Sequence, residues 1–161
     1  MRKGILFDLG NTLVQYFNRN ESLFVLEKCL DSVSIFLEKL GISLDYDNIK
    51  HRIEKENYEL SNHKVRHLEK RLFKIFRLEK LSMTSGVELA ICSQFLKPVF
   101  PKSKVYEDTL PILSELKSRG YKLGIVSNMP WGSPSEPWKI ELQKAGISKY
   151  IDNLVFCSDL G

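Results

Sequence analysis

Apolar residues follow two different spacings along the chain, and the changes between them divide it into segments. The first four-residue run, Gly4 to Phe7, reads Gly-Ile-Leu-Phe. A short and almost wholly apolar run is typical of a strand buried on both faces of a parallel sheet. It is followed by Asp8 and then by Gly10 and Asn11, which are turn residues. The pattern predicts a buried strand that ends at a carboxylate.

Between about residues 18 and 100, the apolar residues recur at intervals of three and four, the spacing of one helix face. The clearest helix ends at Gly41, because glycine readily adopts the conformation that stops a helix. Its apolar stripe consists of Leu23, Leu26, Leu30, Val33, Phe36, Leu37 and Leu40.

Two further helical stretches follow in the same region. The first begins near residues 45–47 and continues as polar helical sequence through Lys80. The second covers 84–97 and is ended by Pro98 and Pro101, since proline cannot continue a helix. The region therefore reads as one all-helical insertion.

The last third of the chain alternates between helix and strand. We expect a helix over 107–119, a strand over 121–126, a helix up to Ala145 and a strand over 151–156. The segment Ser133 to Glu136 resembles a capping box and predicts the start of the second of these helices. Strands that alternate with helices indicate an α/β protein with a parallel sheet.

Composition adds few constraints to this pattern. The chain has 161 residues, 43% of them hydrophobic, and a formal net charge of +4. No apolar run is long enough to span a bilayer, and Asp8 interrupts the apolar stretch after the basic start, so no signal peptide is expected. The three cysteines (Cys29, Cys92 and Cys157) are far apart, which favours small buried side chains over disulfides. We expect a cytoplasmic protein that does not bind a membrane.

Polar residues follow the predicted strands at their carboxyl ends, where α/β proteins place their chemistry. Asp8 follows the first strand, Ser127 and Asn128 follow the second, and Cys157-Ser158-Asp159 follow the third. An aspartate can attack phosphorus and hold the phosphoryl group as an acyl phosphate. A serine hydroxyl at a neighbouring strand end can donate to the same group.

The sequence resembles a known family at these positions. Residues 5–13, ILFDLGNTL, look like the first motif of the haloacid dehalogenase superfamily, and residues 123–128, LGIVSN, look like its second. The helical insertion lies where that superfamily places a helical cap. Residues 157–161 resemble the stretch before the third motif, a Lys-Pro pair. The resemblance implies a Rossmann-like parallel sheet core formed by residues 1–16 and 102–161, incomplete with the first three strands only. Residues 17–101 would form the inserted helical cap domain.

The resemblance also implies roles for particular residues. Asp8 would be the catalytic nucleophile and a Mg²⁺ ligand, and Gly10 would give its backbone carbonyl to the same ion. Ser127 and Asn128 would bind the phosphate, and Thr12 would brace the turn. The implied activity is a Mg²⁺-dependent hydrolysis of a small phosphorylated metabolite through an aspartyl phosphate. A nucleic-acid partner is not expected, and the oligomeric state stays open.

Two departures from the family pattern bear on activity. Phosphatases of the family usually carry a second aspartate where this chain has Gly10, and a glycine cannot protonate a leaving alkoxide. The lysine of the third motif and the acidic pair of the fourth are absent from the 161 residues, and Lys97-Pro98 precedes the second motif. We therefore expect this chain to be an inactive front part of a longer enzyme, with an apolar first strand at a bare sheet edge.

Other functions remain as alternatives. The chain could be a catalytically inactive relative that binds phosphorylated ligands or a protein partner, and Asp8 could merely cap a turn. A phosphorelay receiver is disfavoured, because receivers carry their phosphoacceptor after a later strand. The chain has no phosphate-binding Gly-x-x-x-x-Gly-Lys loop of the kind found in nucleotide hydrolases.

Three further features each allow a purely structural explanation and a functional one. They lie in the helical insertion and in the loop that follows the second strand. His63 and His67 are four residues apart and could bind a metal, but the basic residues around them favour a solvated helix face. Segment 50–80 holds ten Lys or Arg against five Asp or Glu, a surplus of five, and could form the outer face of the cap or attract anionic substrates. Trp131 and Trp138 are expected to pack, although Trp131 could line the mouth of a pocket.

Overall fold

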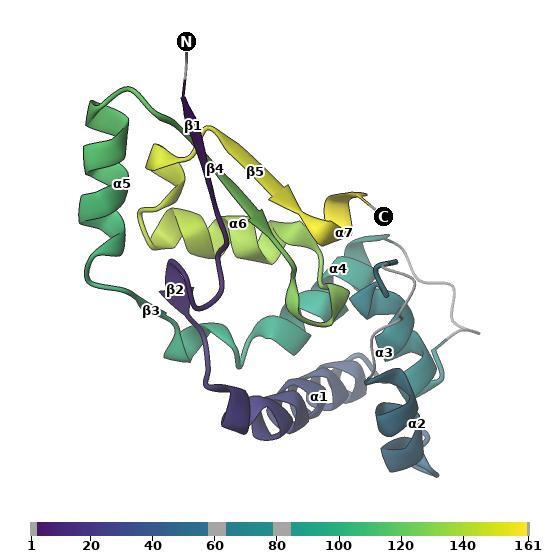
Figure 1. Ribbon diagram of the computed structural model, residues 1–161. Helices are drawn as coiled ribbons and strands as arrows, with labels where there is room; N and C mark the ends of the chain where they lie inside the picture. The colour runs from purple at the N-terminus through teal and green to yellow at the C-terminus, as the bar shows by residue number, and fades with distance from the viewer. Residues whose placement is uncertain (1–2, 58–63, 79–84, 161) are drawn as a thin grey trace.

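The computed structural model describes residues 3–57, 64–78 and 85–160. They form a parallel three-stranded sheet, with a group of helices inserted between its first two strands (Figure 1). The strands of this sheet are β1 (Gly4–Phe7), β4 (Lys122–Ser127) and β5 (Asn153–Phe156). The α/β class and the parallel core with a helical insertion, both predicted from the sequence, are confirmed.

β4 lies in the middle of the sheet, with β1 on one side and β5 on the other. The pairing is parallel and regular, with Phe7 opposite Ile125 at the end of β1. The other edge of β1 pairs with no described strand, and Leu6 is 72% exposed. The prediction that this strand is buried on both faces is therefore wrong for the described residues, whereas the predicted bare edge is present.

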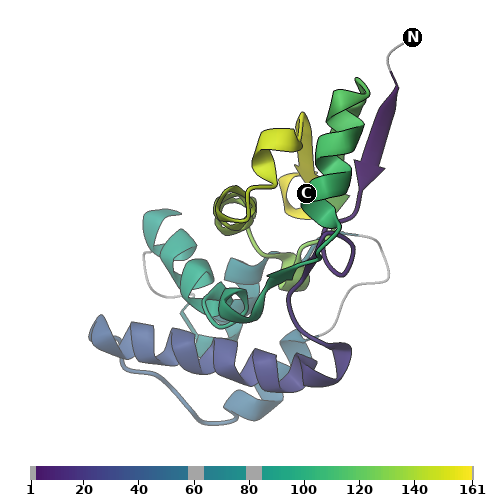
Figure 2. The ribbon, with the colours of Figure 1, turned by 90° about the vertical axis from the view of Figure 1, so that its left-hand side faces the viewer.

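The helices of the core lie on one face of the sheet. Figure 2 shows α5 (Thr109–Ser118) and α6 (Ser135–Lys144) on the same side of β1, and the short α7 (Cys157–Leu160) follows β5 directly. Alternate side chains of β4 face these helices, so Leu123 and Ile125 are fully buried. Val126 points the other way and is 48% exposed, because no described helix covers that face.

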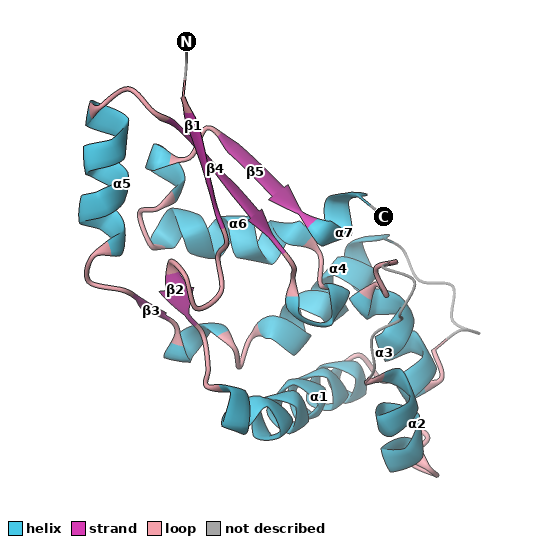
Figure 3. Cartoon of the chain, viewed as in Figure 1, coloured by secondary structure: helices cyan, strands magenta, loops and turns pink. Residues whose placement is uncertain are grey.

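Among the described residues, four α-helices belong to the insertion, coloured cyan in Figure 3 between the short strands β2 (Val14–Gln15) and β3 (Lys104–Val105). They are α1 (Ser22–Lys39), α2 (Ile49–Glu56), α3 (Leu68–Phe76) and α4 (Ser85–Leu96). α1 begins and ends within a residue of the predicted helix, and Gly41 adopts the left-handed conformation expected of a helix stop. Among the described helices, none combines the length and hydrophobicity that crossing a bilayer requires.

The helical sequence predicted from residues 45–47 through Lys80 is confirmed in part, because it holds two described helices, while residues 58–63 and 79–80 lie outside the described residues. These helices are α2 and α3, with His67 in an extended conformation before α3 and Arg77 in a left-handed one after it. Glu56 at the end of α2 is buried and ion-paired with Arg66 from the segment before α3. In one continuous helix these two residues would lie ten positions apart along the axis and could not pair.

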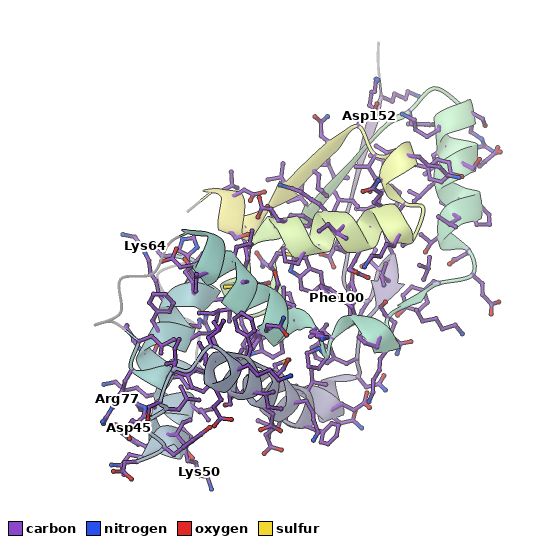
Figure 4. The ribbon with its side chains drawn as sticks, turned by 180° about the vertical axis from the view of Figure 1, so that it is seen from behind. Asp45, Lys50, Lys64, Arg77, Phe100 and Asp152 are labelled. Atoms are coloured by element: carbon purple, nitrogen blue, oxygen red, sulfur yellow. The ribbon has the colours of Figure 1, made fainter. Side chains whose placement is uncertain are left out.

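Some of the basic residues of segment 50–80 are buried or ion-paired within the insertion. Arg66 pairs with Glu56, Arg71 is only 4% exposed, and Arg77 pairs with Asp45 at the outer end of the helices (Figure 4). The prediction of a solvated basic face is therefore wrong for Arg66 and Arg71. Lys74 keeps its side chain in solvent, 59% exposed, as predicted for the outer face.

The predicted capping box at the start of α6 is also wrong. The residue before the helix is Pro134, and no side chain caps the first turn. The Ser133 hydroxyl instead accepts a hydrogen bond of 2.9 Å from the indole Nε1–H of Trp138. A buried indole N–H needs an acceptor, and that requirement takes the hydroxyl away from the helix end.

The insertion joins the core through two short antiparallel strands. β2 (Val14–Gln15) pairs with β3 (Lys104–Val105), so the outgoing and returning chains lie side by side. This pair lies within residues 14–17 and 101–105, the two segments where the sequence predicts hinges between cap and core. The domain boundaries at residues 16/17 and 101/102 stay a prediction.

Asp152 stabilises one end of the sheet, the end that lies away from the carboxyl ends of the strands. Its carboxylate accepts hydrogen bonds of 2.8 Å from the ammonium groups of Lys117 and Lys122 and from the backbone N–H of Leu123 (Figure 4). These donors hold the pKa of Asp152 well below its usual range. One carboxylate therefore ties α5, β4 and the start of β5 together.

The depressed pKa predicts how this tie depends on pH. A group with a lowered folded-state pKa stabilises the fold above its unfolded pKa, near 4, and loses that effect as the pH falls through the folded value. We expect Asp152→Asn to lower Tm by several degrees at pH 7, with the difference narrowing below about pH 4. Thermal melts followed by circular dichroism from pH 2 to 8 measure this, with the exposed Asp108→Asn as the control. Equal Tm values for wild type and Asp152→Asn at pH 7 would contradict it.

Candidate active site

The turn after β1 presents Asp8 at the carboxyl end of the sheet. The Leu9 carbonyl accepts backbone hydrogen bonds from Thr12, Leu13 and Val14 at 3.3, 2.9 and 3.1 Å. Asn11 occupies the left-handed conformation, with φ of 59°, which asparagine tolerates better than most residues. Leu9 is fully buried and anchors the turn, while Asp8 is left exposed.

The parallel pairing of β1 with β4 brings Asp8 to Ser127. The Ser127 hydroxyl donates a hydrogen bond of 2.7 Å to Oδ1 of Asp8, across 119 positions of sequence. The Thr12 hydroxyl donates a longer bond of 3.3 Å to Oδ2. Both carboxylate oxygens thus accept a hydroxyl, which fixes the plane of the carboxylate, and Thr12 lies where the sequence predicts a brace.

Asp8 and Ser127 open into a cavity of about 550 Å³, which Gly10 and Asn128 also line. Asn128 is exposed, and its backbone carbonyl accepts a weak 3.4 Å bond from the Ser127 hydroxyl. The four residues predicted from the sequence therefore share one cavity. Their chemical roles stay predictions.

Sequence reasoning missed the apolar wall of this cavity. The wall includes Leu9, Tyr16, Val126, Met129, Pro130, Trp138, Val155 and Leu160. The rings of Tyr16 and Trp138 meet edge to face with centroids 5.0 Å apart, and burial, followed by the charge of Glu141, raises the pKa of Tyr16. Both tryptophans pack against other rings, as predicted, and Trp138 rather than Trp131 lines the cavity, so the alternative role of Trp131 at its mouth is not supported. The aromatic residues carried no signal that separates a cavity wall from core.

The donor set suits a hard cation only in part. The Asp8 carboxylate and the Gly10 carbonyl are oxygen ligands of the type that Mg²⁺ prefers, and no described residue donates a hydrogen bond to the Gly10 carbonyl. The described lining contains no lysine or arginine. In the described parts of the chain, no group of three or more His, Cys, Asp or Glu residues could hold a metal ion. His63 lies outside the described residues, and Nδ1 of His67 lies 3.9 Å from Glu69.

The three cysteines differ in their surroundings. Cys29 and Cys92 are buried, and burial raises the pKa of both thiols, to about 12 for Cys29. Cys157 is half-buried and lines the cavity, and its sulfur accepts a 3.2 Å hydrogen bond from the backbone N–H of Met129. The prediction of a small buried side chain holds for Cys29 and Cys92 and is wrong for Cys157.

Comparisons with known proteins agree with this geometry. A family model described as haloacid dehalogenase-like hydrolase matches residues 2–161. The chain therefore belongs to the haloacid dehalogenase-like hydrolases. None of the curated proteins matches it.

Solved structures give the same fold. A haloacid dehalogenase phosphatase from Thermococcus onnurineus is 26% identical with a TM-score of 0.52, over 98% of this chain and 63% of that one. A 2-haloacid dehalogenase from Pseudomonas syringae pv. Tomato DC3000 is 13% identical with a TM-score of 0.54, over 99% and 66%. The chain thus spans slightly under two thirds of the length of each.

Thiol chemistry tests the cavity wall directly. We expect iodoacetamide at pH 7.5 to modify Cys157 first, since Cys29 and Cys92 are buried and their raised pKa leaves almost no thiolate. Intact-mass measurement over time should show one fast addition, which Cys157→Ser removes and Cys92→Ser leaves unchanged. Fast modification of Cys29 or Cys92 in the folded protein would show that these thiols are more accessible than the structure has them.

Proposed function

We propose that this haloacid dehalogenase-like hydrolase is a phosphatase that cleaves a small phosphorylated metabolite through an aspartyl phosphate on Asp8. The observation that carries the proposal is the 2.7 Å hydrogen bond between Asp8 and Ser127 at the carboxyl edge of a parallel sheet. This contact supports Asp8 as the nucleophile and Ser127 as the hydroxyl that binds the phosphate, because the two side chains lie next to each other. The likeness to the Thermococcus onnurineus phosphatase, at 26% identity, supports the same reaction class.

The proposed reaction has two steps. An Asp8 oxygen bonds to phosphorus while the bond from phosphorus to the leaving oxygen breaks, and water then attacks the aspartyl phosphate to release inorganic phosphate and free Asp8. Ser127 and Asn128 would hold the phosphoryl oxygens with hydroxyl and amide donors, which favours the transition state as charge develops on them. The apolar wall around Tyr16 and Trp138 suits an organic leaving group more than a second anion.

Magnesium enters the proposal as a cofactor held by the Asp8 carboxylate and the Gly10 carbonyl, together with ligands beyond this pair. When bound, Mg²⁺ would neutralise phosphate charge, which the described cavity does not do because its lining contains no cationic side chain. Asp8 would keep one oxygen for the metal and one for phosphorus. The activity of the whole protein is proposed here, since the chain spans 63% of the length of the Thermococcus protein.

A second candidate function is a catalytically inactive relative that binds phosphorylated ligands or a protein partner. Gly10 favours it, because a glycine cannot supply the proton that the leaving oxygen needs. The described lining of the cavity contains no cationic side chain, which favours this alternative as well. Under this alternative the 161-residue chain does not hydrolyse phosphate esters.

Hydrolysis of an aryl phosphate by the full-length protein, with and without Mg²⁺, tests the first candidate. We expect Mg²⁺-dependent release of phosphate that falls to background in Asp8→Asn and by about 10²-fold in Ser127→Ala, which removes one donor to the transition state. The matched controls are Asp108→Asn and Ser114→Ala, both exposed positions on or beside α5. Activity that survives Asp8→Asn would remove Asp8 from the mechanism. A folded wild type without activity, which still binds phosphate, would support the second candidate.

Gly10 allows a gain-of-function test. A Cβ built at Gly10 meets no atom within 4 Å, and the backbone there is not left-handed, so the position accepts a side chain at Cβ. If the missing general acid limits the rate, Gly10→Asp should raise aryl phosphate hydrolysis by about 10²- to 10⁴-fold. Asn11→Asp adds the same charge one residue away and should give no such rise. An unchanged rate in a folded Gly10→Asp protein would show that proton supply is not the limit.

A further inference from the structure

The turn that follows β4 leaves the core and enters the helical cap. It covers residues 129–133, directly after Ser127 and Asn128, and contains a short 3-10 turn over Pro130–Gly132. The Trp131 ring stacks on Phe17 with centroids 6.2 Å apart and 18° between the planes. It meets Phe95 of α4 edge to face at 5.1 Å. A core tryptophan is thus held between aromatic rings of the cap region.

Trp131 is part of the interior of the cap. It lines a small apolar pocket there whose other residues come from the cap helices and their ends, namely Leu26, Ile53, Glu56, Asn57, Leu68, Arg71, Leu72, Ile75 and Phe95. The same residue does not line the cavity at Asp8. Its side chain therefore serves contact between the two parts of the molecule rather than contact with a ligand.

The next residue brings the two backbones into contact. Gly132 is buried in a left-handed conformation with φ of 65°, and a Cβ there would collide with the backbone carbonyl group of Arg66 and lie 3.1 Å from Val65. Only glycine permits so close an approach at this φ. The core turn is therefore seated directly on cap segment 65–66.

Buried charged residues hold cap segment 65–66 in place. The Arg66 guanidinium pairs with Glu56, and Nε of Arg71 donates a 3.0 Å hydrogen bond to the Arg66 carbonyl. Arg71 also donates to the Glu56 carbonyl at 3.3 Å. These bonds join α2, α3 and the segment between them, so the surface that receives Gly132 is held by the cap itself.

The backbone of the turn is in an unfavourable conformation where it meets the cap. Trp131 is left-handed, with φ of 56°, a conformation that a bulky side chain adopts only when its surroundings enforce it. The enforcing contacts are the cap rings of Phe17 and Phe95. Separation of cap and core would remove them and let the turn relax, so cap position and turn conformation change together.

We propose that Trp131 and Gly132 form a latch that holds the helical cap against the core and links its position to the loop carrying Ser127 and Asn128. The covalent connections between cap and core run through β2 and β3, and the latch adds a non-covalent contact between the same two parts. The latch does not depend on phosphatase activity. If the proposed function holds, it would couple opening of the cap to the donors that bind phosphate.

Hydrogen exchange followed by mass spectrometry tests the latch without any activity assay. In Trp131→Ala and in Gly132→Ala we expect amide exchange to rise tenfold or more in two segments at once. These are residues 128–133, which include the core turn, and residues 65–68, which include the cap segment that Gly132 contacts. The β4 amides at 123–126 should keep the wild-type rate. Trp131→Phe, which keeps an aromatic ring, should restore most of the protection.

The matched control is Phe24→Ala, an exposed aromatic residue of α1 that is 52% exposed. It should leave both segments unchanged. Faster exchange in the core turn alone would overturn the proposal, because the turn would then be stabilised without the cap. A uniform rise across β4, turn and cap would overturn it as well, since Trp131 would then be an ordinary core residue.

Discussion

The parallel pairing of β1 with β4 is the constraint on which the rest of this molecule depends. It aligns Phe7 with Ile125, and so the next residues of both strands emerge at one edge. Parallel strands cannot be joined by a tight turn, so the chain between them must be long. Here that length is used for the whole helical insertion, and 119 positions separate the two side chains that end within hydrogen-bond distance.

The contact between insertion and core is made by aromatic rings, and buried charges hold the insertion's side of it. Rings from both parts pack together, with Phe100 and Tyr16 around Trp138 on one side and Phe17 and Phe95 around Trp131 on the other. The buried ion pair of Glu56 and Arg66 lies within the insertion and not across the junction. Buried charges hold one geometry because an unpaired one is costly, which gives the insertion a defined surface to present.

The strands, and the position of Asp8 and Ser127 at their ends, were predictable because their signals are local, while the chemical roles of these residues stay predictions. A short apolar run followed by Asp8 marks β1, and the second motif places Ser127 at the end of β4. The pairing of Glu56 with Arg66 between α2 and α3 was not predictable, because it depends on the two side chains meeting in three dimensions. The role of Ser133 depends likewise on an indole five residues away, and the choice between Trp131 and Trp138 depends on which ring faces which part. The exposure of Leu6 follows from what lies beside β1, which no local pattern records.

The hydroxyl of Ser127 carries a single proton, and in this structure it is given to Asp8. Any anion that enters beside it competes for that proton. If the anion takes that proton, the Asp8 carboxylate loses its shortest hydrogen-bond donor, and Oδ1 becomes free to contact another group. If Asp8 and Ser127 have the roles proposed for them, recognition of the anion and release of the Asp8 oxygen would be a single exchange of hydrogen-bond partners.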